Sequence, residues 1–213
     1  MKMQKNMTRK IANKKIVLII IFALIFFCSN SFAQGINQSF SSNKNAIKFT
    51  FLSWFSGSTK ISYERAFPEI KQSGEICAGL ISAGYDKYHN SPLGFTLRYG
   101  HKFFIGEYST IKPLDGFFVR PEIIYSHFSY DSKTLNANLE KERNLAQMTA
   151  LLGTFGYQKT FGNFIIDGWV GAGMALGKPA DTGYHHGFQL WNWFGTYNEN
   201  IALSFSIRLG WCF

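Results

Sequence analysis

Beyond its first 33 residues the sequence has no long apolar run, although large apolar side chains are abundant. The chain of 213 residues contains 22 Phe, 10 Tyr and 5 Trp. In a water-soluble domain with this content, some of these side chains would form long buried runs. Apolar residues at helical spacing are also missing, apart from a possible single turn within 136–144. These absences argue against a helical bundle and indicate a β-rich protein with apolar residues at alternate positions.

The excess of basic over acidic residues comes mainly from the N-terminus. The chain has 22 Lys and Arg against 13 Asp and Glu, and residues 1–33 hold six of the basic residues and none of the acidic ones. The basic stretch precedes the apolar segment 16–27, and small residues follow at Ser31 and Ala33, which predicts a signal peptide cleaved after Ala33. This apolar segment is shorter than the about 20 residues that a membrane-spanning helix needs. Since the mature chain is nearly balanced in charge, no nucleic-acid partner is expected.

Cysteine is scarce, with three residues in the whole chain. Cys28 permits an alternative interpretation of the N-terminus, a lipoprotein signal, but Phe27 is bulky where such signals have a small residue. Cys77 and Cys212 lie on segments that should not be neighbours, so we expect them to be unpaired even in an exported protein. The cysteine spacing fits no zinc motif, and the sequence predicts no metal site and no cofactor.

The C-terminal segment 201–213 shows strict alternation. Every second residue from Ile201 to Phe213 is apolar, and the residues between them are small, polar or charged. Period 2 predicts a strand, and this one is about twice the usual 5–6 residues of strands in soluble domains. Alternation and turn signals together predict eight strands, at residues 45–55, 58–67, 75–86, 93–104, 116–130, 147–160, 163–176 and 200–213.

The spacers between these strands differ in length in a way that suggests a topology. With a polar periplasmic leader at 34–44, the long spacers 131–144 and 177–200 would face outward and most short turns inward, although the inner turn 105–115 is long. Short inner turns, long outer loops and an even strand number are typical of outer-membrane barrels. About 9–11 residues of a tilted strand cross the hydrocarbon, and only a closed barrel satisfies its backbone there. We therefore predict an all-β fold over 45–213: an eight-stranded antiparallel up-and-down transmembrane barrel, preceded by the cleavable signal peptide.

The last strand also carries a possible assembly signal. Leu209, Trp211 and Phe213 would occupy its outward positions. A C-terminal Phe on an alternating aromatic strand resembles the signal that the barrel assembly machinery reads. The alternative is the edge strand of a secreted soluble sandwich, where this exposed row would be an aggregation hazard.

The first two predicted strands contain two short motifs. Their residues are Asn45, Ala46 and Lys48, followed by Ser62, Tyr63, Glu64 and Arg65. This opening resembles a family of small outer-membrane barrel proteins of unknown function, with an Asn-Ala-x-Lys first strand and a Ser-Tyr-Glu-Arg second strand. The resemblance implies an eight-stranded fold of the OmpA/OmpX type over 45–213 and no assigned activity.

The same alternation places charged side chains inside the barrel. The expected lumen network comprises Lys48, Glu64, Arg98, Arg120, Glu122, Asp167 and Arg208. An eight-stranded barrel is just wide enough to be filled by side chains, so these charges should neutralise one another in a packed lumen. A selectivity filter or a proton path is the alternative. Since the first, second and last strands are consecutive around the wall, Glu64 is expected between Lys48 and Arg208.

One pair of residues could be catalytic. His127 and Ser129 lie two apart on the outward face of the fifth strand, as in the His-x-Ser pair of outer-membrane lipases such as lipid A deacylases, where histidine takes the serine proton. Tyr130 departs from the Asn of that family's pattern, and no acid partner is identifiable. His185 and His186 point apart on an extended segment, so we expect solvated loop residues there and no metal site.

The sequence therefore predicts an integral protein of the cell outer membrane, structural or loop-presenting, with a packed lumen unlike that of a general porin. Its expected partners are outer-membrane lipids and lipopolysaccharide, the barrel assembly machinery, and an extracellular or periplasmic partner of unknown identity. Two alternatives remain: an outer-membrane acyl hydrolase, and a barrel accessory to an envelope secretion or assembly system.

Overall fold

The computed structural model describes residues 43–86, 90–106, 112–132, 142–193 and 196–213. The predicted signal peptide at 1–33, the alternative signal ending at Cys28 and most of the leader at 34–44 lie outside the described residues. Among the residues described, no helix is long and apolar enough to cross a membrane.

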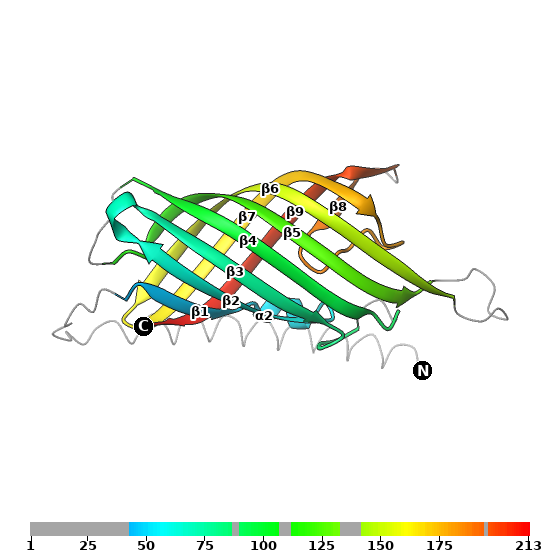
Figure 1. Cartoon of the computed structure of the whole chain (residues 1–213), viewed down its shortest axis with the longest axis horizontal. Helices are drawn as coiled ribbons and strands as arrows, with labels where there is room; N and C mark the ends of the chain where they lie inside the picture. Colours follow the sequence, from blue (N-terminus) through cyan, green and yellow to red (C-terminus); the bar gives the residue numbers. More distant parts are fainter. Residues whose placement is uncertain (1–42, 87–89, 107–111, 133–141, 194–195) are drawn as a thin grey trace, which may run out of the picture. The chain divides into compact units, whose positions relative to one another are not determined.

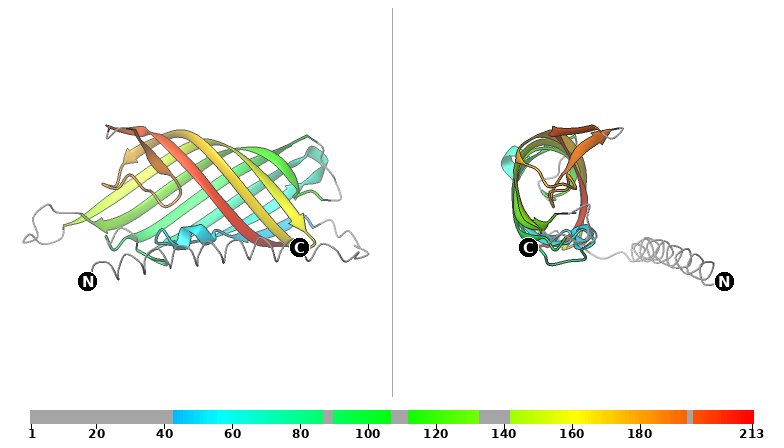
Figure 2. Two further views of the ribbon diagram at one scale, coloured as in Figure 1. Left: turned by 180° about the vertical axis from the view of Figure 1, so that it is seen from behind. Right: turned by 90° about the vertical axis from the view of Figure 1, so that its right-hand side faces the viewer.

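Eight wall strands in the described part of the chain form one closed antiparallel barrel, as the sequence predicts (Figures 1 and 2). The wall strands pair in chain order, and β1 pairs with β9 from Ala46–Cys212 to Phe49–Leu209, which closes the ring. The strands are β1 (Asn45–Phe49), β2 (Ser58–Phe67), β3 (Gln72–Ile81), β4 (Leu93–Ile105), β5 (Gly116–Asp131), β6 (Arg143–Phe161), β7 (Phe164–Lys178) and β9 (Thr196–Cys212).

Side chains alternate between the inside and the outside of the barrel along each wall strand. On β2, Ser62 and Glu64 are buried, whereas Ile61 and Tyr63 between them are exposed. Every wall strand contributes large apolar side chains to the exterior, among them Ile47, Ile61, Ile76, Leu97, Ile123, Leu151, Val170 and Phe205. Because successive residues of a strand point to opposite faces, one face of each strand is apolar and exposed while the other lines the interior.

The two ends of the barrel differ in their connections. The start of β1 and the end of β9 share one end, here called the terminal end, with the turn formed by η1 (Pro68–Ile70) and the β6–β7 turn (Figure 1). Leu114, from the β4–β5 connection, packs at this end with Ala46, Ala66, Ile165 and Cys212. Cys77 and Cys212 are buried and free of disulfide bonds, as predicted.

The first strand is shorter than its predicted range of 45–55. β1 stops at Phe49, and α2 (Phe51–Trp54) follows it. The amide of Thr50 still donates a hydrogen bond to the Lys60 carbonyl oxygen at 3.1 Å. Strict alternation ends here, since Phe51, Trp54 and Phe55 have the i, i+3, i+4 spacing of a helical turn.

The third strand is displaced toward the N-terminus relative to its predicted range of 75–86. β3 begins at Gln72, directly after Lys71, which adopts a left-handed conformation with φ of 55°. The strand ends at Ile81, since Ser82 has φ of 107°, outside the extended region. In contrast, β6 and β9 begin four residues before their predicted starts at 147 and 200.

Part of the predicted loop 177–200 is ordered and lies within the barrel. Residues 179–188 fold into the end opposite the terminal end, here called the loop end, and lead into β8 (Gln189–Trp193), which pairs with β9 (Figure 2). Phe188 and Leu190 are buried in a cluster with Ile124, Met148, Ala150, Leu152, Ala175 and Ala202. These apolar contacts close much of the loop end.

Candidate functional site

All seven charged residues expected in the lumen are buried inside the barrel. Lys60, Glu75 and Lys102 are buried with them, so the described residues place six cations and four anions in the interior. Alternation could have identified all three. Lys60 lies an even number of residues from Glu64 on the same strand, and Lys102 an even number from Arg98, so each points to the same face as its neighbour. Glu75 lies on the strand with the faintest alternation, where only Ile76 and Leu80 mark the outward face.

Glu75 is the most highly coordinated carboxylate of this network. Its oxygens lie 3.0 Å from Lys48 Nζ and 3.5 Å from Lys102 Nζ. Arg120 approaches to 3.5 Å, and the guanidinium of Arg208 pairs with both carboxylate oxygens. Four cations from four other strands therefore meet one acidic residue that sequence reasoning missed.

Two further carboxylates complete the centre of the network. Asp167 Oδ2 lies 2.7 Å from Lys48 Nζ, 2.8 Å from Lys102 Nζ and 2.6 Å from Arg208 Nη2. Glu64 contacts Lys48 and, at 3.2 Å, Lys102. The expectation that Arg208 would be the second cation at Glu64 is wrong, because Arg208 lies directly opposite Asp167 in the β7–β9 ladder and pairs with it.

The three central carboxylates have the spacing of a cation site. Ligand oxygens of Glu64, Glu75 and Asp167 lie within 4.8 Å of one another. However, the ammonium groups of Lys48 and Lys102 lie among these oxygens, each within 3.5 Å of all three residues. Two protein cations thus already offset much of the negative charge that would attract a metal ion.

Trp169 forms a second centre, next to the carboxylates. Its ring lies 4.3 Å from the guanidinium carbon of Arg208, 4.6 Å from that of Arg120 and 5.0 Å from that of Arg98. Guanidinium groups bind favourably over indole faces. Gly100 makes room for Arg120, since a Cβ atom there would lie 2.6 Å from Arg120 Cδ. Trp169 lies two residues from Asp167, so alternation already placed it inside.

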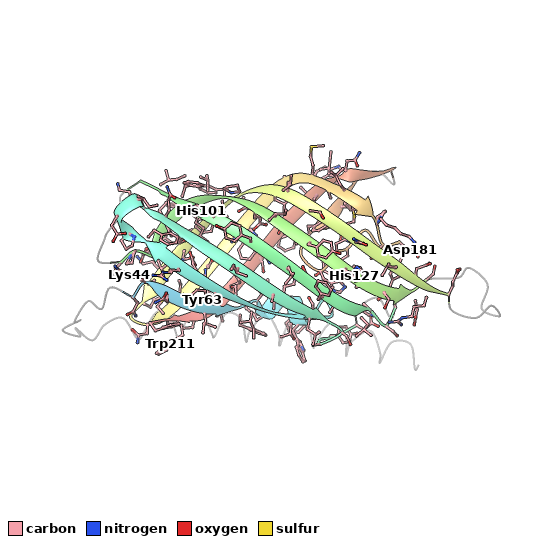
Figure 3. The ribbon with its side chains drawn as sticks, viewed as in Figure 1. Lys44, Tyr63, His101, His127, Asp181 and Trp211 are labelled. Atoms are coloured by element: carbon pink, nitrogen blue, oxygen red, sulfur yellow. The ribbon has the colours of Figure 1, made fainter. Side chains whose placement is uncertain are left out.

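The possible catalytic pair is not joined in the structure. His127 lies on the half of the barrel that holds Asp181, away from Lys44 and Trp211 (Figure 3). Its ring stacks on Phe95 at 5.7 Å, and its buried Nδ1 has no hydrogen-bond partner in the described part of the chain.

Ser129 is bound to other groups. Its Oγ donates to the Leu93 carbonyl oxygen at 3.3 Å and accepts a hydrogen bond from Arg143 Nη2 at 2.8 Å. Among the described residues no hydrogen bond joins Ser129 to His127. The serine hydroxyl is therefore turned toward a carbonyl oxygen and away from a base.

His185 and His186 are buried, and their expected solvation is wrong. His185 stacks on Phe188 at 5.1 Å, and His186 meets Phe128 edge-on at 4.9 Å. Burial lowers the pKa of His185 to about 4. Burial, and to a lesser extent the charge of Lys60, lower the pKa of His186 to about 3. Both imidazoles are thus neutral at physiological pH and belong to the interior packing.

The residues of the possible assembly signal lie on the exterior at the terminal end. Leu209, Trp211 and Phe213 are all exposed, and Figure 3 shows Trp211 on the outer surface. The backbone of Phe213 is fixed, since its amide donates to the Asn45 carbonyl oxygen at 2.9 Å and its own carbonyl oxygen accepts from the Asn45 amide at 3.1 Å.

The chemistry of this interior is that of paired charges joining opposite parts of the wall. No protein-family model, curated protein or solved structure matches the chain. Its function is therefore inferred from the barrel alone.

Proposed function

We propose that the chain is an integral outer-membrane β-barrel protein with a structural or loop-presenting role, whose packed lumen does not serve as a general pore. One observation carries this proposal: large apolar side chains cover the exterior of all eight wall strands, while ten charged side chains of the described residues are buried inside. Soluble proteins bury apolar side chains and keep charged residues at the surface. A barrel in lipid needs the reverse on its outer face.

The lengths of the wall strands also support a location in a lipid membrane. The wall strands other than β1 have 10 to 19 residues. Tilted strands of about 9–11 residues cross the hydrocarbon core, and closure removes the exposed edges that lipid does not tolerate. The expected partners are accordingly membrane lipids and lipopolysaccharide, with the barrel assembly machinery acting on the C-terminal strand.

The packed interior argues for a scaffold over a channel. Lys102 on β4 reaches Asp167 on β7, and Arg208 on β9 reaches Glu75 on β3, so ion pairs cross the lumen in more than one direction. At the loop end, Phe188 and Leu190 pack between the strands. Eight strands leave an interior that side chains fill.

A substitution at Leu151 tests the lipid-facing exterior. Leu151 lies midway along β6 and is 60% exposed. If this surface faces lipid, Leu151→Arg should lower the free energy of unfolding by about 2–4 kcal/mol in vesicles, measured by urea titration. Leu151→Met is the matched control and should remain close to the wild type. At a water-exposed position, Leu151→Arg would change stability by only about 0.5 kcal/mol, and that outcome would contradict a membrane location.

A further inference from the structure

The wall of the barrel is incomplete between β1 and β9. β1 pairs with β9 only as far as Phe49–Leu209, and on the same side of β9 the β8 pairing begins at Leu203. Residues 204–208 of β9 therefore have no strand partner on that side in the described ranges. α2 lies against β2 and β9 at this place, here called the wall gap.

A cavity of about 110 Å³ lies at the wall gap. Its lining includes the outward-facing Phe205 together with the buried Lys60, Arg98 and Trp169. Residues from both faces of the wall share this lining. The cavity thus connects the polar interior with the apolar exterior of the barrel.

Ser53 and Ser204 at this cavity are hydrogen-bonded to backbone carbonyl oxygens, whereas other buried polar groups of its lining lack partners. Arg98 Nε and Nη1, Thr50 Oγ1 and Trp169 Nε1 are buried, and no described residue forms a hydrogen bond with these atoms. The nearest carboxylate oxygen to Arg98, from Glu122, is 3.8 Å away. Lys60 has no ion pair within the part of the chain that the structure describes. All four side chains can donate hydrogen bonds, so together they suit an acceptor-only anion.

The net positive charge of the interior also favours an anion as the ligand. Six buried cations face four buried anions among the described residues. Two of these cations, Lys60 and Arg98, line the cavity; they lie outside the central carboxylate cluster and lack a close carboxylate among the described residues. Burying an unpaired charge is costly, whereas an ionised acceptor forms short and strong hydrogen bonds. An oxyanion in the cavity would compensate the excess positive charge.

We propose that the cavity binds the carboxylate or phosphate head of a single-chain amphiphile, with the alkyl chain leaving through the wall gap past Leu52 and Phe205. A water molecule takes up about 30 Å³, so the cavity has room for a head group and not for a long chain. The chain would then lie along the apolar exterior. This inference rests on the proposed membrane location, which supplies both the lipid phase and the ligand.

Titration calorimetry on the full barrel, refolded in neutral maltoside micelles, tests the proposal. Dodecanoate and dodecyl phosphate should bind saturably, whereas acetate, inorganic phosphate and dodecanol should bind far more weakly. Equally tight binding of acetate or inorganic phosphate would reveal a site for free anions and overturn the amphiphile. Equally tight binding of dodecanol would show apolar adsorption and overturn the role of the cations.

Variants separate the site from the fold. Lys60→Met and Arg98→Gln should each weaken dodecanoate binding about tenfold to a hundredfold, whereas Lys71→Met, in the exposed turn at the terminal end, should bind like the wild type. Ser206→Trp, which fills the cavity from β9, should abolish binding. Heat-modifiable migration in gels checks that each variant is folded. Unchanged binding in folded Lys60→Met and Arg98→Gln proteins would overturn the proposal, while the Leu151→Arg result would still decide the membrane location independently.

Discussion

Arg208 and Glu75 form a two-pronged ion pair across the lumen, between strands that are not neighbours in the wall. Arg208 Nη2 lies 2.7 Å from one oxygen of Glu75, and Nη1 contacts the other. β1 and β2 lie between β9 and β3 in the ring. Paired donors on a planar guanidinium match a carboxylate in both geometry and charge. This pair therefore ties β3 to β9 and strengthens the part of the wall where β1 is short.

Glu75→Ala should lower the free energy of unfolding by about 3–5 kcal/mol, because it leaves buried cations without their shared carboxylate. Urea titration of the refolded barrel, followed by fluorescence, measures this change. Glu69→Ala is the matched control, since the Glu69 side chain is 76% exposed and its ion pair among the described residues is a surface contact with Lys44. Its effect should stay within about 0.5 kcal/mol. Equal effects of the two substitutions would show that the network adds nothing to stability.

Alternation, turn signals and spacer lengths together were sufficient to predict the closed eight-stranded barrel, and alternation identified seven of the ten charged side chains that the described residues bury inside it. Lys48 and Glu64 are buried because they lie between outward residues such as Ile47 and Tyr63. The partners within the lumen were harder to predict. Glu75 receives cations from four other strands, and side-chain length and strand tilt decide such contacts. The alternation of apolar and polar residues shows neither how far a side chain reaches across the lumen nor how the strands are tilted.

The irregular parts escaped prediction for a different reason. Phe51, Trp54 and Phe55 contain a helical spacing, but a single turn is too short to stand out against the strand pattern before it. His185 and His186 are buried through aromatic contacts with Phe128 and Phe188. Such contacts depend on where a loop folds in space.

The buried histidines predict a dependence of stability on pH. Their folded pKa values, about 4 for His185 and about 3 for His186, are below the ordinary value of 6.5. Below pH 6.5 the unfolded chain therefore binds protons that the folded chain does not, and stability should fall as the pH decreases from about 6.5 toward 4. Urea midpoints at pH 8, 6 and 5 measure this trend.

A histidine variant isolates this contribution from that of the carboxylates. His186→Phe should reduce the loss of stability between pH 8 and pH 5, because one group that resists protonation in the folded state is gone. Identical losses in the variant and the wild type would mean that His186 is protonated as readily in the folded protein as in the unfolded chain, and so is not buried as described.

The packed lumen predicts that the purified protein forms no steady channel in planar lipid bilayers. Ion pairs such as Lys102–Asp167, at 2.8 Å, join opposite parts of the wall. An eight-stranded barrel is just wide enough for side chains to fill its interior, so we expect no steady ion flow through it. A general porin under the same voltage and salt is the positive control. Stable, salt-dependent current steps from the wild-type barrel would contradict the scaffold and indicate a pore.

Ser129→Ala should leave the acylation pattern of lipid A unchanged in cells, since the hydroxyl of Ser129 faces the Leu93 carbonyl oxygen and Arg143. Mass spectrometry of lipid A from wild-type, variant and deletion strains provides the comparison. Loss of a deacylated species in both the variant and the deletion strain would instead support the acyl hydrolase.

The last prediction concerns Phe213, which closes the barrel and ends the chain. Its backbone makes two hydrogen bonds with Asn45 of β1, while the residue as a whole is 53% exposed. If the ring is read by the assembly machinery, Phe213→Asp should prevent insertion and leave aggregated or degraded protein in the periplasm, although both backbone hydrogen bonds remain possible. Phe213→Trp keeps an aromatic end and should insert normally.

The measurement is the fraction of heat-modifiable barrel in outer-membrane preparations, compared with refolding of the same variants in micelles. An Asp variant that fails in cells but refolds in micelles would support a signal function, because the substitution would then impair insertion in the cell without impairing folding itself. Normal insertion of Phe213→Asp in cells would exclude that function and leave Phe213 a purely structural role in pairing β9 with β1.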